Sequence, residues 1–322
     1  MNKNSSLTYA YLLNGKGGGQ SLTWEEIKRW TPDKGVLWIH LNFTQPEAQQ
    51  WLKQHLDHIS YLALTAEDVR PRTISEEHYL LVFLRGVNLN PREDPEDMVS
   101  IRIFINKDMI VTTHKRNLIS TKDISDALQK NIGPKTPGEF ITMINERLTY
   151  HMSEVIEELS DTVDELENKM IKEESHELRP KIAEIRREAI DFKRYLTPQR
   201  EAIHQLMHVK TPLINEDNIL YLRESNDRLY RYIEDLDSAR EQASITQEEL
   251  SSRLTEKMES RMYVLSIVAV IFLPLTFITG LLGINVAGIP GATNHYAFLT
   301  VSLICLVICI LLYLVLRHKK WL

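Results

Sequence analysis

A stretch of 55 residues without a charged side chain lies near the end of this 322-residue chain. Between Met262 and Leu316 there is no Asp, Glu, Lys or Arg, whereas all 44 acidic residues lie before it. Two segments of this stretch, Val264–Leu282 and Ala297–Leu316, are each long enough for a helix to cross the hydrocarbon core of a bilayer, which needs about 20 residues. The sequence therefore predicts a soluble acidic body that carries two membrane spans near its C-terminal end.

The basic residues that flank the two segments predict how they are oriented. Three precede the first span and three follow the second: Arg253, Lys257 and Arg261, then Arg317, Lys319 and Lys320. The loop between the spans, residues 283–296, has neither Lys nor Arg. Because Lys and Arg are retained on the cytoplasmic side of a membrane, we expect a multi-pass helical hairpin with both chain termini in the cytosol and the loop outside.

The two spans differ in polarity. The second consists largely of Leu, Ile and Val, whereas the first contains Ser266, Pro274, Thr276, Thr279 and Gly280. Either this polar side lines a pore, or the hydroxyls hydrogen-bond their own backbone and the Gly permits close helix packing. Two helices cannot enclose a water-filled path, and polar backbone does not face lipid. The pore interpretation therefore requires several copies of the chain around an axis.

Residues 1–138 are expected to form a mixed α/β domain. Four stretches rich in β-branched and aromatic residues predict strands, the last of them with a hairpin turn at 106–108: Leu7–Leu13, Val36–Phe43, Tyr79–Leu89 and Val99–Thr113. Helices are predicted between them at Trp24–Trp30 and Pro46–His58. The Gly-rich segment 14–19 lacks the Gly-Lys-Ser/Thr ending of a phosphate-binding loop, so it predicts a turn.

Residues 139–261 are highly charged and are expected to be helical. Helices are predicted at Phe140–Glu177, which has an acidic run, from Pro180 to just before Thr211, and at Asn215–Leu282. Apolar residues recur every seventh position along the last helix, at Leu222, Leu229, Leu236, Ala243 and Leu250. Such heptads predict packing against another helix, as in a coiled coil. This helix forms a stalk that continues into the first span. Such a stalk can act as a lever on the span, or it can be a plain spacer between the head and the membrane.

One pair of histidines is a candidate metal site. His204 and His208 lie four residues apart on a predicted helix, so both imidazoles can reach one ion, with Glu201 one turn earlier as a third ligand. The alternative is two solvated surface histidines. The acidic run of the preceding helix has the same two interpretations, a surface that concentrates cations or an ordinary solvated helix face.

Several classes of function are disfavoured. A net charge of −6 disfavours a nucleic-acid partner. The two cysteines, Cys305 and Cys309, lie inside the second span, which excludes a disulfide-built domain and a Cys-rich zinc finger. The sequence contains no nucleophile elbow, phosphate loop, kinase set or metalloprotease helix. We therefore expect a protein that is not an enzyme and holds no cofactor.

The end of the first span resembles that of the CorA-type divalent metal ion transporters. From Thr279 to Gly291 the chain reads TGLLGINVAGIPG, where the family carries Gly-Met-Asn at the end of its pore helix. Ile284 replaces the Met, between Gly283 and Asn285, and Gly-Ile-Pro-Gly follows. That variant resembles the zinc transporter branch, ZntB. The resemblance continues at residues 66–72 and 84–88 and extends over essentially the whole chain.

The resemblance implies an α+β membrane protein that assembles as a funnel-shaped homopentamer. Its parts would be a cytosolic α/β head, residues 1–138, a helical bundle and stalk, 139–261, and a transmembrane hairpin, 262–322. Asn285 would ring the outer mouth of the pore, where an amide can hold a hydrated cation without trapping it. Four residues match the family's pore-facing positions, and their spacing of 3, 8 and 3 fits one helix face: Met262, Leu265, Leu273 and Thr276.

Two consequences of the resemblance concern the ion. Asn285 lies nine residues beyond Thr276, on the opposite face of an ideal helix, so the helix must unwind near residues 280–283 for Asn285 to face the axis. The outer loop has no acidic residue, unlike many magnesium-type members, which excludes a carboxylate ring there.

The leading hypothesis is a bacterial inner-membrane Zn²⁺ transporter. The alternatives are a Mg²⁺, Co²⁺ or Ni²⁺ channel of the same architecture and a membrane-tethered scaffold or sensor.

Overall fold

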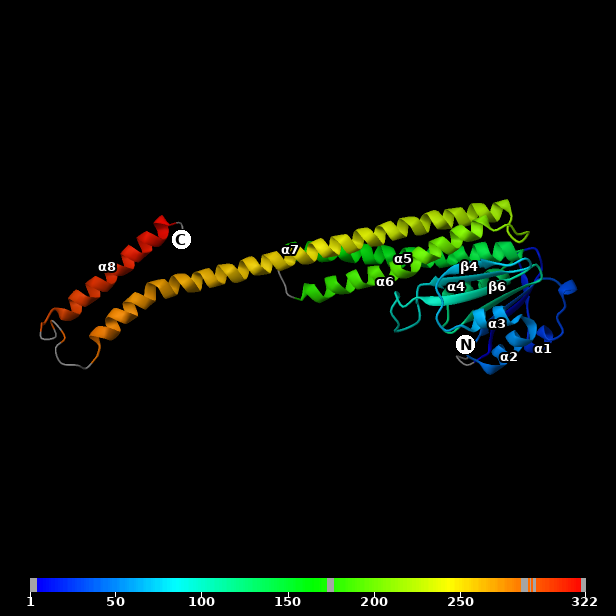
Figure 1. Ribbon diagram of the computed structural model, residues 1–322, viewed down its shortest axis with the longest axis horizontal. Coiled ribbons are helices and arrows are strands. Elements are labelled where there is room, and N and C mark those ends of the chain that lie inside the picture. The colour runs from blue at the N-terminus through cyan, green and yellow to red at the C-terminus, as the bar shows by residue number, and fades with distance from the viewer. Residues whose placement is uncertain (1–4, 173–176, 285–288, 290, 292–293, 320–322) are drawn as a thin grey trace. The chain divides into compact units, whose positions relative to one another are not determined.

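The computed structural model describes residues 5–172, 177–284, 289, 291 and 294–319. The chain divides into two compact units, Met1–Gln247 and Glu248–Leu322. Figure 1 shows the elements of both units.

The first unit is built on a mixed sheet whose strands follow the order β2-β1-β3-β7-β6-β5-β4. Neighbouring strands are antiparallel except β3 and β7, which run parallel. The strands are β1 Leu7–Leu13, β2 Gly19–Ser21, β3 Leu37–Asn42, β4 Arg72–Ser75, β5 Leu80–Gly86, β6 Val99–Ile105 and β7 Met109–His114. The four predicted strand regions are confirmed, and the last divides into β6 and β7 at the predicted turn. The short strands β2 and β4 were not expected.

Helices cover both faces of this sheet. On one face, α1 Trp24–Ile27, α2 Pro46–His55 and α3 His58–Thr65 pack on a core that includes Ile39, Leu41 and Phe104. The intervening side chains of β3 point to the other face, where the Trp38 ring lies 5.1 Å from that of Phe140 on α5. That face is covered by α4 Ile119–Gln129, α5 Pro137–Lys172 and α6 Leu178–His208. A 3₁₀ turn, Pro32–Lys34, precedes β3.

The helix predicted at Pro46–His58 is divided in two by a capping residue. Asp57 accepts hydrogen bonds from the backbone N–H groups of Ile59 and Ser60, at 2.9 and 3.0 Å. Its own backbone is extended, so α2 ends at His55 and α3 begins at His58.

The prediction for the start of α6 is wrong by two residues. The helix begins at Leu178, and Pro180 lies in its first turn, where a missing N–H costs nothing.

Within the first unit, the long helices α5 and α6 and the N-terminal part of α7 lie side by side (Figure 1). The helix α7 runs from Glu216 to Leu282, close to the predicted range. Within the first unit Lys193 on α6 pairs with Asp237 at 2.6 Å, and Gln242 donates to Asp164 on α5 at 2.9 Å. The four heptad residues of this unit, Leu222, Leu229, Leu236 and Ala243, are buried, which confirms helix-against-helix packing there, and Leu250 of the second unit is buried as well.

The second unit contains the C-terminal part of α7 and the helix α8, Ala297–His318. Both helices contain an apolar window long enough to cross a membrane. Within the chain these windows are almost bare: side chains such as Leu273 and Phe298 are 71% and 86% exposed. A continuous apolar surface of this kind needs lipid or another copy of the chain to cover it.

Candidate functional site

The described residues that match the family's pore-facing positions all lie on α7. Met262, Leu265 and Leu273 are 60%, 63% and 71% exposed, and Thr276 is exposed as well. Their spacing brings them to one face of a continuous helix. Among the residues that the structure describes, none buries these side chains, so this face is available to other chains or to an ion pathway.

The first span ends near residues 280–283, where the sequence predicts that the helix unwinds. The helix α7 ends at Leu282, and the Gly283 N–H donates to the carbonyl oxygen of Gly280 at 3.2 Å in a tighter closing turn. A Cβ added at Gly283 would lie 2.9 Å from the Thr279 carbonyl oxygen, which is closer than real side chains approach. Ile284 is 49% exposed. Asn285 lies outside the described residues, so its place at the pore mouth stays a prediction.

Two hydroxyl groups of the first span, those of Ser266 and Thr279, donate hydrogen bonds to the backbone of their own helix. Ser266 Oγ donates to the Met262 carbonyl oxygen at 2.9 Å, and Thr279 Oγ1 donates to that of Leu275 at the same distance. This is the backbone bonding that short polar side chains adopt in apolar surroundings. Pro274 stands inside α7, which continues to Leu282. A hydroxyl that donates to the backbone still has an oxygen that can accept a hydrogen bond. These side chains can therefore bond their own helix and line a pore at the same time.

His204 and His208 lie together on the surface of α6. Their ring centroids are 4.5 Å apart, and His208 Nδ1 lies 2.8 Å from the His204 carbonyl oxygen, which leaves Nε2 of His208 facing outward. The Glu201 carboxylate accepts from Gln205 at 3.2 Å. Within the described residues no three His, Cys, Asp or Glu side chains are placed to hold one metal ion. The histidine pair therefore offers two ligands, and a third must come from elsewhere.

A cleft of about 550 Å³ between α5, α6 and the loop before β6 gathers many carboxylates. The acidic residues that line it are Asp94, Glu96, Glu158, Glu165, Glu184 and Glu188, together with the bases Lys169, Lys181 and Arg187. Burial raises the pKa of Glu188, and the neighbouring charges of Glu96 and Glu184 raise it further. The cleft therefore carries a negative potential that attracts cations without holding one in a ligand cage.

The sequence had indicated only one wall of this cleft. Glu158 and Glu165 belong to the acidic run of α5, whose other members are Glu154, Glu157, Asp161, Asp164 and Glu167. The opposite wall comes from α6, where Glu184 and Glu188 are four residues apart on one face, and from the loop with Asp94 and Glu96. The i, i+4 pair on α6 was the signal that could have revealed it.

The two head segments of the family resemblance form a buried polar contact. On β5, Arg85 Nη2 donates to Asp68 at 2.8 Å and to the Val69 carbonyl oxygen at 3.1 Å. Arg102 on β6 donates to the carbonyl oxygens of Ala66 and Glu67, both at 2.8 Å. These arginines satisfy backbone carbonyls in the segment that follows α3. The motif residues therefore hold the head together.

Comparisons with known proteins agree with this architecture. The family model described as "CorA-like Mg2+ transporter protein" matches residues 33–318. The zinc transport protein ZntB of Yersinia enterocolitica is 34% identical over 99% of this chain and 97% of its own length. The divalent cation transporter CmaX of Pseudomonas aeruginosa is 38% identical over 98% of this chain and 97% of its own length.

Solved structures show the same fold. The full-length CmaX structure has a TM-score of 0.85 at 36% identity, and the match covers 98% of both chains. The CorA magnesium transporter of Methanocaldococcus jannaschii, at 19% identity, has a TM-score of 0.83 over 98% of this chain and 99% of its own. The mixed-sheet head, the long helices and the two apolar C-terminal helices are thus one family architecture. Members of this family are ion transporters rather than enzymes, and this chain belongs to the CorA-like family of divalent cation transporters.

Proposed function

We propose that this protein carries Zn²⁺ across a bacterial inner membrane, through a pore lined by the first span of five copies. The observation that carries the proposal is the bare face of α7. The side chains of Met262, Leu265, Leu273 and Thr276 share this face, and all four are exposed within the described part of the chain. It leads to the Gly283-Ile284-Asn285 sequence at the end of the span.

A single chain cannot perform this task. Two helices enclose no water, and a polar path that faced lipid would leave backbone and ion without hydrogen-bond partners. Several copies with their α7 faces turned inward remove both problems. The more uniformly apolar α8 is then the outer helix, in contact with lipid. The family resemblance supports a homopentamer, which native mass measurement in mild detergent tests directly.

The proposed ion path has a different kind of polar group near each of its two ends. At the outer mouth, a ring of Asn285 amides would replace part of the ion's hydration shell with neutral oxygens, which bind weakly enough to release it. On the cytosolic side, the carboxylates around Glu188 would raise the local concentration of cations near the helices. The transported ion is the substrate, and the proposal includes no resident cofactor.

The choice of Zn²⁺ rests on the similarity to ZntB and on the Ile at position 284. A broader specificity, including Mg²⁺, Co²⁺ or Ni²⁺, is the second candidate. Two observations favour it: the relative named as a divalent cation transporter, and an outer loop, residues 283–296, without any carboxylate to select among metals. An amide ring that handles hydrated ions discriminates among them weakly.

Flux into liposomes separates the two candidates. The purified full-length protein is reconstituted alone, and the uptake of Zn²⁺, Mg²⁺ and Co²⁺ is followed with and without an imposed pH gradient. We expect Zn²⁺ to enter faster than the other two metals, and protein-free liposomes provide the baseline. Mg²⁺ uptake equal to or faster than Zn²⁺ uptake would assign the protein to the broader class. No uptake of any metal would reject transport.

The orientation of the proposed hairpin is tested in cells. Cys305 and Cys309 are first replaced by Ala, and single cysteines are then introduced as Asn294→Cys in the loop and Lys319→Cys after α8. A membrane-impermeant maleimide applied to intact spheroplasts should label the loop cysteine only. Labelling of the position 319 cysteine instead would reverse the assignment of the cytosolic side.

A further inference from the structure

The carboxyl ends of the two parallel strands form a crevice in the head. β3 ends at Asn42 and β7 ends at His114, and these two residues are paired in register. After β3 the chain passes to α2 on one face of the sheet, and after β7 it passes to α4 on the other face. This is a topological switch point, where open α/β sheets commonly bind small ligands.

The crevice has the volume of a small-molecule site. One cavity of about 560 Å³ is lined by Asn42, His114, Lys115 and Arg116 among others. A second cavity of about 200 Å³ is lined by Tyr9, Leu89, Ile119 and Lys122 among others. Thr8, Asn90 and Asn117 line both cavities, so the two adjoin. Ligand pockets in proteins commonly measure about 300–1,000 Å³.

The charged lining of the crevice is mainly basic. Lys115, Arg116 and Lys122 contribute three positive charges, and Glu93 is the acidic residue among the lining residues. Glu93 already accepts from Arg116 Nη1 at 3.0 Å. The Lys115 side chain is more than half exposed, and its Nζ lies 3.6 Å from the carboxylate of the exposed Glu67 side chain, a pair of little energetic value. Arg116 is paired with Asp97 as well as with Glu93, so Lys115 and Lys122 are the groups that attract an anion to the crevice.

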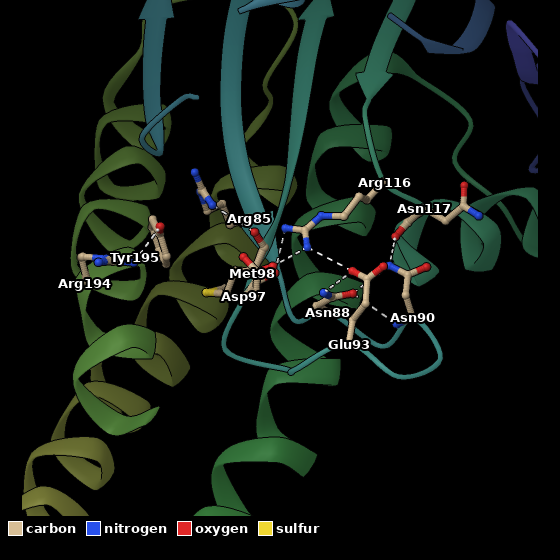
Figure 2. A network of polar contacts seen from close by, with 10 residues as sticks. All are labelled: Arg85, Asn88, Asn90, Glu93, Asp97, Met98, Arg116, Asn117, Arg194 and Tyr195. Atoms are coloured by element: carbon tan, nitrogen blue, oxygen red, sulfur yellow. Dashed lines mark hydrogen bonds and ion pairs between the residues drawn. The ribbon is translucent and has the colours of Figure 1, made fainter. Parts of the chain in front are cut away.

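The rim of the crevice is held in place by its own hydrogen bonds, as Figure 2 shows. Arg116 binds Asp97 through Nη1 and donates to the Asp97 carbonyl oxygen at 3.0 Å. Asn90 Nδ2 donates to the Asn117 carbonyl oxygen at 3.0 Å, across 27 residues of sequence. The loop before β6 is thereby tied to the segment that enters α4. A ligand that enters this crevice meets walls that are already ordered, which lowers the entropy cost of binding.

The smaller cavity adds a different chemistry. Leu89 and Ile119 are 43% and 38% exposed and line this cavity together with Tyr9 and Lys122, so it offers an apolar surface next to a lysine. Ile119 also begins α4, an 11-residue helix whose N-cap, Leu118, offers no side-chain acceptor to the first turn. The positive end of the helix therefore adds to the charge of the lysines.

We propose that this crevice binds a small phosphate-bearing molecule of nucleotide size. Its phosphate lies between Lys115 of the larger cavity and Lys122 of the smaller one, and its apolar or aromatic part lies against Leu89 and Ile119, which line the smaller cavity beside Lys122. The neutral polar groups that line the crevice, including Asn42 and Asn117, are suited to hydroxyl groups between the two ends. This proposal concerns the head alone and does not depend on which metal the protein transports.

The test uses ADP as the probe and the full-length protein in detergent, with EDTA present so that metal bridging is excluded. Isothermal titration should detect saturable binding of ADP to the parent protein. The double variant Lys115→Ala with Lys122→Ala should raise the dissociation constant about tenfold or more, because two charge-assisted contacts are lost. Both side chains are exposed, so the fold tolerates their removal.

The matched control is Lys107→Ala. Lys107 is an exposed lysine in the turn that precedes β7, at the opposite end of that strand. The control should bind ADP as the parent does. Absence of ADP binding to the parent at millimolar concentration, or equal affinity in the double variant, overturns the proposal. Inorganic phosphate bound as tightly as ADP overturns the role of the apolar end.

Hydrogen exchange locates the site independently. ADP should protect the backbone amides of residues 89–93 and 115–122 in the parent protein. Protection confined to other parts of the chain places the binding elsewhere and rejects the crevice.

Discussion

The imidazole rings of His40 and His114 stack 4.4 Å apart, with an angle of 20° between their planes, on the two parallel strands of the sheet. Both side chains are buried, and each ring has a threonine partner: Thr112 for His40 and Thr8 for His114, each at 2.8 Å. Two buried imidazole rings in contact cannot both be protonated without a large electrostatic cost. Burial lowers the pKa of His114 to about 4, and burial together with the neighbouring ring lowers the pKa of His40 as well.

This pair predicts how the stability of the protein depends on pH. Above pH 6.5 the His114 ring is neutral in both the folded and the unfolded chain. Between pH 6.5 and pH 4 the unfolded chain binds a proton that the folded chain excludes, so the free energy of unfolding decreases as the pH falls. His114 alone accounts for about 2 kcal/mol by pH 5. We expect the thermal unfolding midpoint to decrease less between pH 7 and pH 5 in His114→Asn than in the parent.

The exposed His78 provides the control for this measurement. His78→Asn should show the same pH dependence as the parent. If His114→Asn also keeps the full decrease, the acid sensitivity comes from other groups.

Replacement of Gly283 should impair transport. The Cβ of Gly283→Ala would lie 2.9 Å from the Thr279 carbonyl oxygen, so the closing turn of α7 must shift. We expect Zn²⁺ flux in liposomes to decrease by about tenfold, because a small misplacement at a binding position has a large effect on rate. Gly280→Ala is the matched control, since nothing lies within 4 Å of its added Cβ. Equal flux in the two variants would show that the geometry of this turn is unimportant.

Asn285→Ala should abolish or strongly reduce Zn²⁺ flux while the oligomer remains intact. An amide at the outer mouth replaces water around the ion, and a methyl group cannot. Flux is measured in liposomes, and assembly is measured by native mass in the same preparation. Unchanged flux would mean that the ion is not recognised at this position, and loss of the oligomer would assign Asn285 to assembly.

The two histidines of α6 should contribute little to tight zinc binding. A structural zinc site uses four ligands, and His204 and His208 supply two. We expect His204→Ala with His208→Ala to bind as many Zn²⁺ ions, with the same affinity, as the full-length parent in calorimetry at pH 7.5. Loss of one tightly bound ion would establish a site there, completed by a ligand from another chain.

The sequence alone predicted those features that depend on local pattern. An apolar run of about 20 residues can only be satisfied by a spanning or deeply buried helix, and a seven-residue repeat brings Leu222 and Leu229 to one face whatever surrounds them. The run of aliphatic and aromatic residues at Leu7–Leu13, with Thr8 as its β-branched member, similarly indicated β1 with its observed bounds. The order of membrane spans, stalk and head followed from these patterns, as did the family resemblance.

Only the tertiary structure decided which distant residues meet. The parallel pairing of β3 with β7 brings His40 beside His114, although 74 positions separate them, and it creates the crevice at the ends of both strands. The carboxylates of Glu96, Glu158 and Glu188 likewise come from a loop and two helices. No local pattern encodes such contacts, because they depend on which strands pair and which helix faces pack. The sequence shows which side chains are present, and the fold determines which of them lie close together.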